Sequence, residues 1–322
     1  MPDAKFFEDD VQDLDQALDA VTSALLSIDD AVRRIGSAVR RSYDQIYNGQ
    51  YTGRFKWDQL AKVEKTHFGS LVEINIQREL GIVDGRRLDF HIGGSDVDCK
   101  YSQRDGGWMI PPEAIDQICM VLKADDRTAR WGLGLIRCSP DALNKGSNRD
   151  AKKTISRAGR DRIIWVWDDE QFPENVLVTL PDDEILRIMS PRSGAQRLDQ
   201  LFRTVQERRI TRGTVATVAQ QQDYMKRARA NGGSRSRLRA EGILVLGDSQ
   251  NHQDLAEGLG VTSPQRGEFV AVAVAEAAIS GPGVVEIDAG LWRRALADDL
   301  VSPAPELPNK STAAARDQQV VG

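Results

Sequence analysis

Residues 86–102 read RRLDFHIGGSDVDCKYS, and the architecture expected for the first half of the chain follows from this stretch. In 86–92 the apolar residues Leu88, Phe90 and Ile92 alternate with polar ones, and the alternation resumes over 96–102 after GGS at 93–95. Alternation with a period of two indicates β-strands, and a glycine-rich break between two such strands indicates a tight turn. The stretch therefore predicts a β-hairpin.

The hairpin carries an acid–lysine cluster. Side chains two residues apart on a strand share a face, so Asp98 and Lys100 point to one side while their neighbours point into the core. The hairpin brings Asp89 alongside this pair. Mg²⁺ is commonly held by one or two carboxylates together with phosphate and water oxygens, so the pattern predicts a magnesium site with Lys100 steering or activating water. The plainer alternative is a solvated salt bridge between strands.

A third carboxylate, Glu73, precedes the hairpin in the helical stretch THFGSLVEINIQREL (66–80). It borders the apolar stripe of Phe68, Val72, Ile76 and Leu80 instead of lying on the opposite, solvated face. A carboxylate there either supports the acid–lysine cluster or is only part of an amphipathic helix.

Patterns on either side of the hairpin predict an α/β (α+β) fold. Spacings of three and four over 11–47 and 57–80 indicate helices, and the short apolar runs at 118–122 and 131–138 indicate two buried central strands. Residues 148–167 form a basic helix candidate that ends in two tryptophans. We therefore expect a mixed sheet flanked by helices.

In the second half, helices are expected at 195–210 and 214–230, a glycine turn at 232–233, and strands at 243–246 and 268–274. Helix, helix, turn and strand is a winged-helix order, of the helix-turn-helix, CAP-like kind. The domain boundaries expected are 1–168 for the first domain, 169–175 for a linker, 176–301 for the winged-helix-like domain and 302–322 for a disordered tail.

Composition sets limits on function. The 322 residues are 40 % hydrophobic and 28 % charged, as in an ordinary globular protein, and no apolar run is long enough to cross a bilayer. The acidic N-terminus does not resemble a signal peptide, so we expect a cytoplasmic protein without membrane association. Three separated cysteines without a CxxC pair predict neither a zinc site nor disulfides.

The net charge of −5 hides a basic segment. Residues 203–239 hold ten Lys or Arg against two acids, and a second basic stretch spans 145–162. Such clusters favour contact with DNA phosphates, although a solvated helix face is the alternative, and the glutamines could reach base edges or face solvent. The candidate DNA-binding residues are Arg212, Gln220, Gln221, Lys226, Arg227, Arg229, Arg235, Arg237 and Arg239, with Lys152 and Lys153 in the first half, where interdomain surface is an equal alternative.

Several longer segments of the sequence are more specific to one family than these patterns. They are DQIYNGQYTGRF (44–55), KTHFGSLVEIN (65–75), VDCKYS (97–102), WMIPPEAI (108–115), TVAQQQDYMKRARANGGSRS (217–236) and EGILVLG (241–247). A helical Glu followed by Asp and Asp-x-Lys on a hairpin resembles the PD-(D/E)xK nucleases, and these words resemble the NaeI family of two-site, type IIE restriction endonucleases. One departure from the wider superfamily is that Leu88, and not proline, precedes Asp89.

The resemblance implies an active-site set of Glu73, Asp89, Asp98 and Lys100, with Mg²⁺ held by Asp89, Asp98 and the Cys99 carbonyl, and with Glu73 orienting Lys100, binding water or supporting a second ion. It implies Mg²⁺-dependent double-strand cleavage of DNA, expected at GCCGGC, that leaves 5′-phosphate ends and is stimulated by a second copy of the site bound at the C-terminal domain. A homodimer and a companion DNA methyltransferase are further implied partners. The resemblance also implies that the mixed sheet is restriction-endonuclease-like and that the protein works in a bacterial cytoplasm. Whether Lys100 is a base or an electrostatic stabiliser stays open, with the second role the safer one.

Two rival functions fit parts of the pattern. A non-catalytic winged-helix regulator would bind DNA without cutting it, and Asp98 and Lys100 would then form only a salt bridge. A topoisomerase-like enzyme would need a tyrosine nucleophile such as Tyr101 or Tyr224, but neither has a cluster of His and Arg near it in sequence.

Overall fold

The computed structural model describes residues 5–229 and 232–307, with side chains from residue 16 onward. The chain divides into two compact units. The first contains residues up to 46 and 60–173, and the second contains residues 47–59 and those from 174 on. The short excursion of 47–59 into the second unit was not predicted from the sequence.

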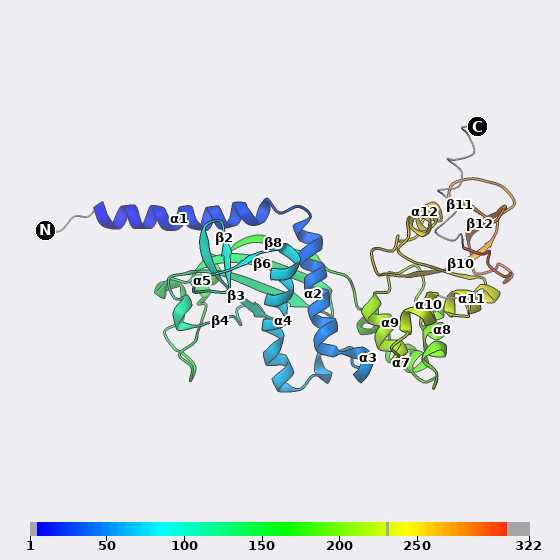
Figure 1. Cartoon of the computed structure of the whole chain (residues 1–322), viewed down its shortest axis with the longest axis horizontal. Helices are drawn as coiled ribbons and strands as arrows, with labels where there is room; N and C mark the ends of the chain where they lie inside the picture. Colours follow the sequence, from blue (N-terminus) through cyan, green and yellow to red (C-terminus); the bar gives the residue numbers. More distant parts are fainter. Residues whose placement is uncertain (1–4, 230–231, 308–322) are drawn as a thin grey trace. The chain divides into compact units, whose positions relative to one another are not determined.

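The first unit is built around a six-stranded mixed sheet in the order β1-β2-β3-β5-β6-β8. Strands β2, β3, β6 and β8 are labelled in Figure 1. β3 and β5 pair in parallel, and the other neighbours pair antiparallel. The predicted hairpin is confirmed as β2 and β3, joined through Gly93 and Gly94, which both have positive φ as a tight turn requires. The two predicted central strands are confirmed as β5 and β6. The bounds are β1 Val83–Asp84, β2 Phe90–Ile92, β3 Ser95–Ser102, β5 Ile118–Asp125, β6 Arg130–Arg137 and β8 Ile164–Gln171.

Helices α1 (Lys5–Leu26), α2 (Ala31–Tyr47) and α4 (Lys62–Leu80) accompany this sheet (Figure 1). α4 begins where the Glu64 carboxylate accepts a 2.8 Å hydrogen bond from the Ala61 backbone N–H, and it ends at Gly81 with a φ of 72°. The smaller elements are β4 Met109–Ile110, β7 Lys153–Thr154, α5 Arg157–Arg160 and the 3-10 turns Pro112–Ala114 and Pro140–Ala142.

The helix predicted over 148–167 is wrong. That segment contains β7, the four-residue α5 and the start of β8, and both tryptophans lie on β8, where Trp165 pairs with Gly134 and Trp167 with Leu133. β-propensity and pairing with β6 decide the outcome at this end of the segment, where the basic composition suggested a helix.

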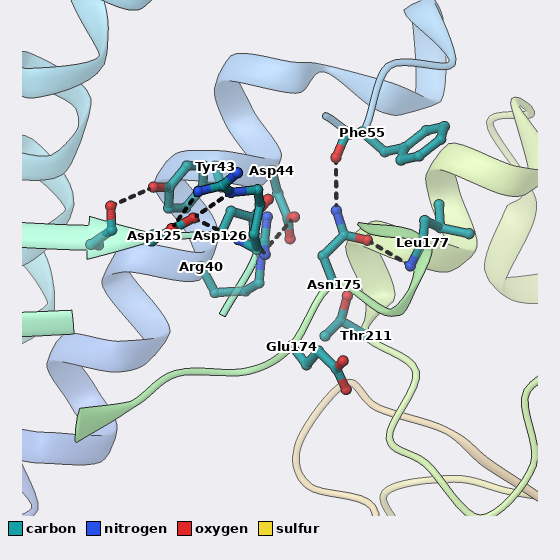
Figure 2. A network of polar contacts seen from close by, with 12 residues as sticks. Arg40, Tyr43, Asp44, Phe55, Asp125, Asp126, Glu174, Asn175, Leu177 and Thr211 are labelled. Atoms are coloured by element: carbon teal, nitrogen blue, oxygen red, sulfur yellow. Dashed lines mark hydrogen bonds and ion pairs between the residues drawn. The ribbon is translucent and has the colours of Figure 1, made fainter. Parts of the chain in front are cut away.

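A buried polar network ties α2 to the end of β5 (Figure 2). Arg40 is only 4 % exposed, contacts the Asp126 carboxylate, and donates a 3.0 Å hydrogen bond from Nε to Asp44. Tyr43, on the same helix, donates to the Ala124 carbonyl at 3.0 Å. A buried guanidinium needs such carboxylates to offset its desolvation, so the network fixes α2 against the sheet.

The second unit has a four-stranded antiparallel sheet in the order β11-β12-β10-β9, preceded by short helices. Both predicted strands are confirmed, as β9 and β10, the second beginning two residues later than expected. The strands are β9 Ile243–Leu246, β10 Val270–Glu276, β11 Val284–Ile287 and β12 Gly290–Arg294. The helices are α3 Gly49–Thr52, α6 Val176–Thr179, α7 Asp182–Met189, α8 Gly194–Thr204, α9 Arg212–Ala219, α10 Tyr224–Arg229, α11 Ser234–Leu238 and α12 Gln250–Gly258, with 3-10 turns at Trp57–Gln59 and Arg239–Glu241.

Two expectations for this half need correction. The single helix expected over 214–230 is two helices, because Gln220 adopts a left-handed conformation with a φ of 51° and ends α9. The disordered tail expected from 302 is wrong where the structure describes it, since Ala304 is 1 % exposed and donates a backbone hydrogen bond to Arg239 O at 2.8 Å. Residues 308–322 of the predicted tail lie outside the described residues.

Segment 47–59 belongs to the second unit through specific contacts. Asn175 donates from its amide to the Phe55 carbonyl at 3.0 Å and accepts from Leu177 N–H (Figure 2). Gly49 packs so closely on α9 that a Cβ there would lie 2.0 Å from Thr217 Oγ1. Only glycine fits this contact, which accounts for one glycine of the word GQYTG.

Within the described parts of the chain, no helix combines the length and apolar character needed to span a bilayer.

Candidate active site

The four predicted active-site residues lie on neighbouring elements of the first unit. Glu73 is on α4, Asp89 directly precedes β2, and Asp98 and Lys100 are on β3. Phe90 pairs with Val97, so the antiparallel register carried on by one residue places Asp89 opposite Asp98. The hairpin thus brings together residues that are nine positions apart in the sequence.

Lys100 is the centre of the cluster. Its Nζ lies 2.8 Å from Asp98 Oδ1, 3.3 Å from Asp89 Oδ2 and 2.9 Å from the Cys99 carbonyl oxygen. The predicted shared face of Asp98 and Lys100, with Asp89 beside them, is therefore confirmed. Three oxygens therefore surround the Lys100 ammonium. Their negative charge and lone pairs make this a favourable position for a cation.

Asp89 is held by the backbone as well as by the lysine. Its Oδ2 accepts a 2.7 Å hydrogen bond from the Cys99 N–H, in addition to the contact with Lys100. A carboxylate fixed by two donors has little freedom to rotate, which keeps its oxygens directed at the cluster.

Charges within the cluster shift its pKa values. Burial raises the pKa of Asp98 to about 6 despite the opposing effect of Lys100. Burial alone would lower the pKa of Lys100, but the Asp98 and Asp89 carboxylates outweigh it and raise that pKa above its ordinary value. At neutral pH Asp98 is therefore mainly ionised and Lys100 keeps its proton.

Burial and the charges of the cluster also shift the pKa of Glu73. Burial, and then repulsion by Asp89, raises the pKa of Glu73 to about 7, with Lys100 acting in the opposite direction. Glu73 is partly buried on α4, a helix that contacts β3, so its side chain does not lie on the fully solvated face of that helix.

The donor set fits a magnesium ion. Two carboxylates and a backbone carbonyl are hard oxygen ligands, and Mg²⁺ in proteins commonly uses one or two carboxylates and completes its shell with water and phosphate. No group of three His, Cys, Asp or Glu side chains that could hold a metal occurs among the described residues. A metal here would therefore depend on the Cys99 carbonyl and on displacement of the Lys100 ammonium from the same oxygens.

One neighbour of the cluster was missed in the sequence. Cys119 on β5 is the register partner of Asp98 on β3, and its Sγ lies 3.8 Å from Asp98 Oδ2. No sequence motif marks this cysteine, because its place beside Asp98 depends on the parallel pairing of two strands whose registered residues are 21 positions apart.

The predicted DNA-binding residues of the second unit divide into two groups. Arg212, Gln220, Lys226 and Arg227 are exposed, although Arg212 donates to the Tyr224 hydroxyl at 2.7 Å and Arg227 pairs with Asp223. These exposed side chains can reach a ligand at the surface.

The other arginines have partners within the unit. Arg237 donates two hydrogen bonds, of 2.7 and 2.8 Å, to the Asp199 carboxylate. Two further ion pairs join Arg229 to Asp248 and Arg239 to Glu306. Arg235 donates to the Val245 carbonyl at 2.9 Å, and burial lowers its pKa to about 10.

The remaining candidates lie at intermediate depth. The side chain of Gln221 packs beside Gly194, in contrast to the exposed Gln220. In the first unit, half-buried Lys152 and Lys153 lie at β7, where Lys153 pairs with Ile110 of β4.

Neither tyrosine is placed as a nucleophile. Tyr101 donates to the Ala124 carbonyl at 3.0 Å, and burial raises its pKa above the ordinary value. The Tyr224 hydroxyl accepts from Arg212 in the second unit. A tyrosine nucleophile needs a lowered pKa or an adjacent base, so these contacts argue against the hypothesis of a topoisomerase-like enzyme.

A mixed sheet that carries two carboxylates and a lysine on a hairpin is the arrangement expected of a phosphodiester-cleaving nuclease. A family model described as restriction endonuclease NaeI matches residues 19–303. The chain is also 41 % identical over 305 residues to the type II restriction enzyme NaeI of Lentzea aerocolonigenes, covering 92 % of this chain and 96 % of that enzyme. The chain is thus a type II restriction enzyme, a site-specific deoxyribonuclease. It belongs to the NaeI restriction endonuclease family.

Proposed function

We propose that this enzyme cuts both strands of DNA at GCCGGC with an active site formed by Glu73, Asp89, Asp98 and Lys100. The observation that carries the assignment is the convergence of Asp98 Oδ1, Asp89 Oδ2 and the Cys99 carbonyl on the Lys100 ammonium. Strand ends bearing a 5′-phosphate are the expected products.

Asp89, Asp98 and the Cys99 carbonyl would hold Mg²⁺, and Glu73 would bind one of its waters or support a second ion. Bound there, Mg²⁺ would supply positive charge that polarises the scissile phosphate. No histidine or cysteine side chain belongs to this proposed ligand set, which favours a hard cation over zinc.

Lys100 acts as an electrostatic stabiliser in this proposal. Two carboxylates within 3.3 Å favour its charged form, and a protonated amine cannot accept a proton from water. Its charge instead neutralises the negative charge that builds up on the phosphate in the transition state. Glu73, with a pKa of about 7, can hold or release a proton near neutral pH and so orient a water beside Lys100.

The second unit is proposed to be a winged-helix-like domain that binds a second copy of the recognition site and stimulates cleavage by the first unit. Support comes from the order of α8, α9, α10 and α11 before β9, and from the hairpin of β11 and β12. The exposed residues Lys226 and Arg227 are the side chains best placed for phosphate contact.

A homodimer follows from the two-fold symmetry of a palindromic target, and a companion methyltransferase would protect host DNA in the bacterial cytoplasm. Sizing chromatography tests the first point, since a monomer at working concentration would contradict it.

The decisive test is plasmid cleavage by wild type, Asp98→Ala and Lys100→Ala with Mg²⁺ or with EDTA. We expect discrete fragments only from wild type with Mg²⁺, and retained DNA binding by both variants. Wild-type cleavage by Asp98→Ala would refute the assigned site. Plasmids with one or two GCCGGC sites then test stimulation, which predicts faster cleavage of the two-site plasmid and rescue of the one-site plasmid by an added oligonucleotide.

A further inference from the structure

The carboxylate of Asp98 is buried and must be held by donors. Asp98 is 3 % exposed, and its Oδ1 is bound by Lys100 at 2.8 Å. A buried carboxylate oxygen without a donor loses its hydration without replacement, so the second oxygen also needs a partner. Among the donors that the described residues provide, the Cys119 thiol is the one that reaches Oδ2, at 3.8 Å.

The pairing of β3 with β5 sets the position of this thiol. Cys119 is fully buried on β5, directly opposite Asp98 in the parallel pair of β3 and β5. Directly opposite residues on neighbouring strands lie side by side on the same face of the sheet. The thiol therefore approaches Asp98 from β5, while Lys100 approaches from along β3.

The thiol has a single proton to donate. The Ala114 carbonyl is a second acceptor at 4.0 Å, but the charged oxygen is nearer and attracts the S–H more strongly.

We propose that Cys119 is a positioning residue of the active site. Its thiol holds the Asp98 carboxylate in the rotation that directs Oδ1 at the cation position shared with Asp89 and the Cys99 carbonyl. The inference rests on the proposed assignment of Asp98 as a metal ligand. Partners that orient a ligand from outside the coordination shell commonly change metal affinity or activity about 10–100-fold when removed. A thiol is a weak donor, so the effect expected here is at the low end of that range.

The test compares Cys119→Ala, which removes the donor, with Cys119→Ser, which retains one. We expect Cys119→Ala to raise the Mg²⁺ concentration for half-maximal cleavage about tenfold and to reduce the Ca²⁺-induced rise in melting temperature, with DNA affinity unchanged. Cys119→Ser should stay within about threefold of wild type, because a hydroxyl can donate to the same oxygen.

Ile155→Val is the matched control. Ile155 is fully buried in the same apolar cluster, and the substitution also removes one heavy atom, but an isoleucine side chain has no donor for Asp98. Ile155→Val should therefore keep the wild-type Mg²⁺ dependence. Equal shifts in Cys119→Ala and Ile155→Val would reduce the effect to core packing and overturn the proposal, as would a wild-type Mg²⁺ dependence in Cys119→Ala.

Should Cys119→Ala not fold, Cys119→Val fills the space without a donor and takes its place against Cys119→Ser. Asp98→Ala separates the two hypotheses. If Asp98→Ala is inactive while Cys119→Ala behaves as wild type, only the role of Cys119 fails. If Asp98→Ala cleaves normally, the proposed active site fails with it.

Discussion

Removal of the Lys100 ammonium should destabilise the first unit in the absence of metal. The side chains of Lys100 and Asp98 are 23 % and 5 % exposed, with Nζ 2.8 Å from Asp98 and 3.3 Å from Asp89. At an effective dielectric constant of about 20, these contacts correspond to attractions of about 6 and about 5 kcal/mol before desolvation is counted. Desolvation offsets most of this, and breaking a mostly buried pair costs about 3 kcal/mol, at the lower end of what such pairs show.

Thermal unfolding of Lys100→Ala in EDTA measures this cost. A loss of about 3 kcal/mol in a unit of this size corresponds to a fall in melting temperature of about 6–12 °C. Because a divalent cation would use the same oxygens as the ammonium, Ca²⁺ should recover more stability in Lys100→Ala than it adds to wild type. Cleavage in Mg²⁺ should fall about 100-fold or more, since the variant lacks a charge aimed at the phosphate.

Lys123→Ala provides the control for this prediction. Lys123 also pairs with an aspartate, at 2.8 Å from Asp168, but that carboxylate is 47 % exposed. An exposed pair contributes about 0–1 kcal/mol, so Lys123→Ala should melt within a few degrees of wild type and gain nothing special from Ca²⁺. A Lys100→Ala protein that melts like Lys123→Ala and responds to Ca²⁺ like wild type would refute the reasoning.

Three further predictions concern other parts of the chain. Arg237→Ala should lower the melting temperature of the second unit, because Arg237 is bound by Asp199 within it. The double variant Lys226→Ala/Arg227→Ala should leave the melting temperature unchanged but weaken DNA binding, with a shallower salt dependence in fluorescence anisotropy. The opposite pattern would reverse these roles. Tyr101→Phe should retain cleavage within about tenfold, measured on plasmid, because its hydroxyl is not a nucleophile in this scheme; complete loss of cleavage with a normal melting temperature would contradict that. Gly49→Ala should destabilise the second unit by about 1–3 kcal/mol in urea unfolding because the added methyl overlaps α9, and unchanged stability would show that α9 can shift.

The parts predicted correctly are those that a short sequence window controls. The hairpin of β2 and β3 has strict alternation and a two-glycine turn, so its register needs little help from elsewhere. The register then fixes Asp98, Lys100 and Asp89 together, which is why the acid–lysine cluster was predicted. Glu73 was placed on its helix, but its distance from the cluster could not be inferred before α4 was packed against β3.

The errors lie where distant pairing outweighs local pattern. The segment 148–167 looked helical by its basic composition, yet β6 has glycines at 132 and 134 that leave room for Trp165 of β8. The helix expected at 214–230 ends at Gln220. The DNA contact expected of Arg237 stays a prediction, but its ion pair with Asp199 could not be seen in the sequence. A charge count cannot separate an arginine that binds phosphate from one that binds an aspartate 38 residues away.

The sequence by itself determined the family, the hairpin and the chemical nature of the acid–lysine cluster, because these depend on residue type and on spacings of a few positions. Only the tertiary structure decided that the three oxygens converge on the Lys100 ammonium, that Cys119 faces Asp98, and that residues 47–59 fold with the second unit. These features arise from strand order, parallel register and side-chain burial. They are set by contacts between residues far apart in the chain, which no local pattern encodes.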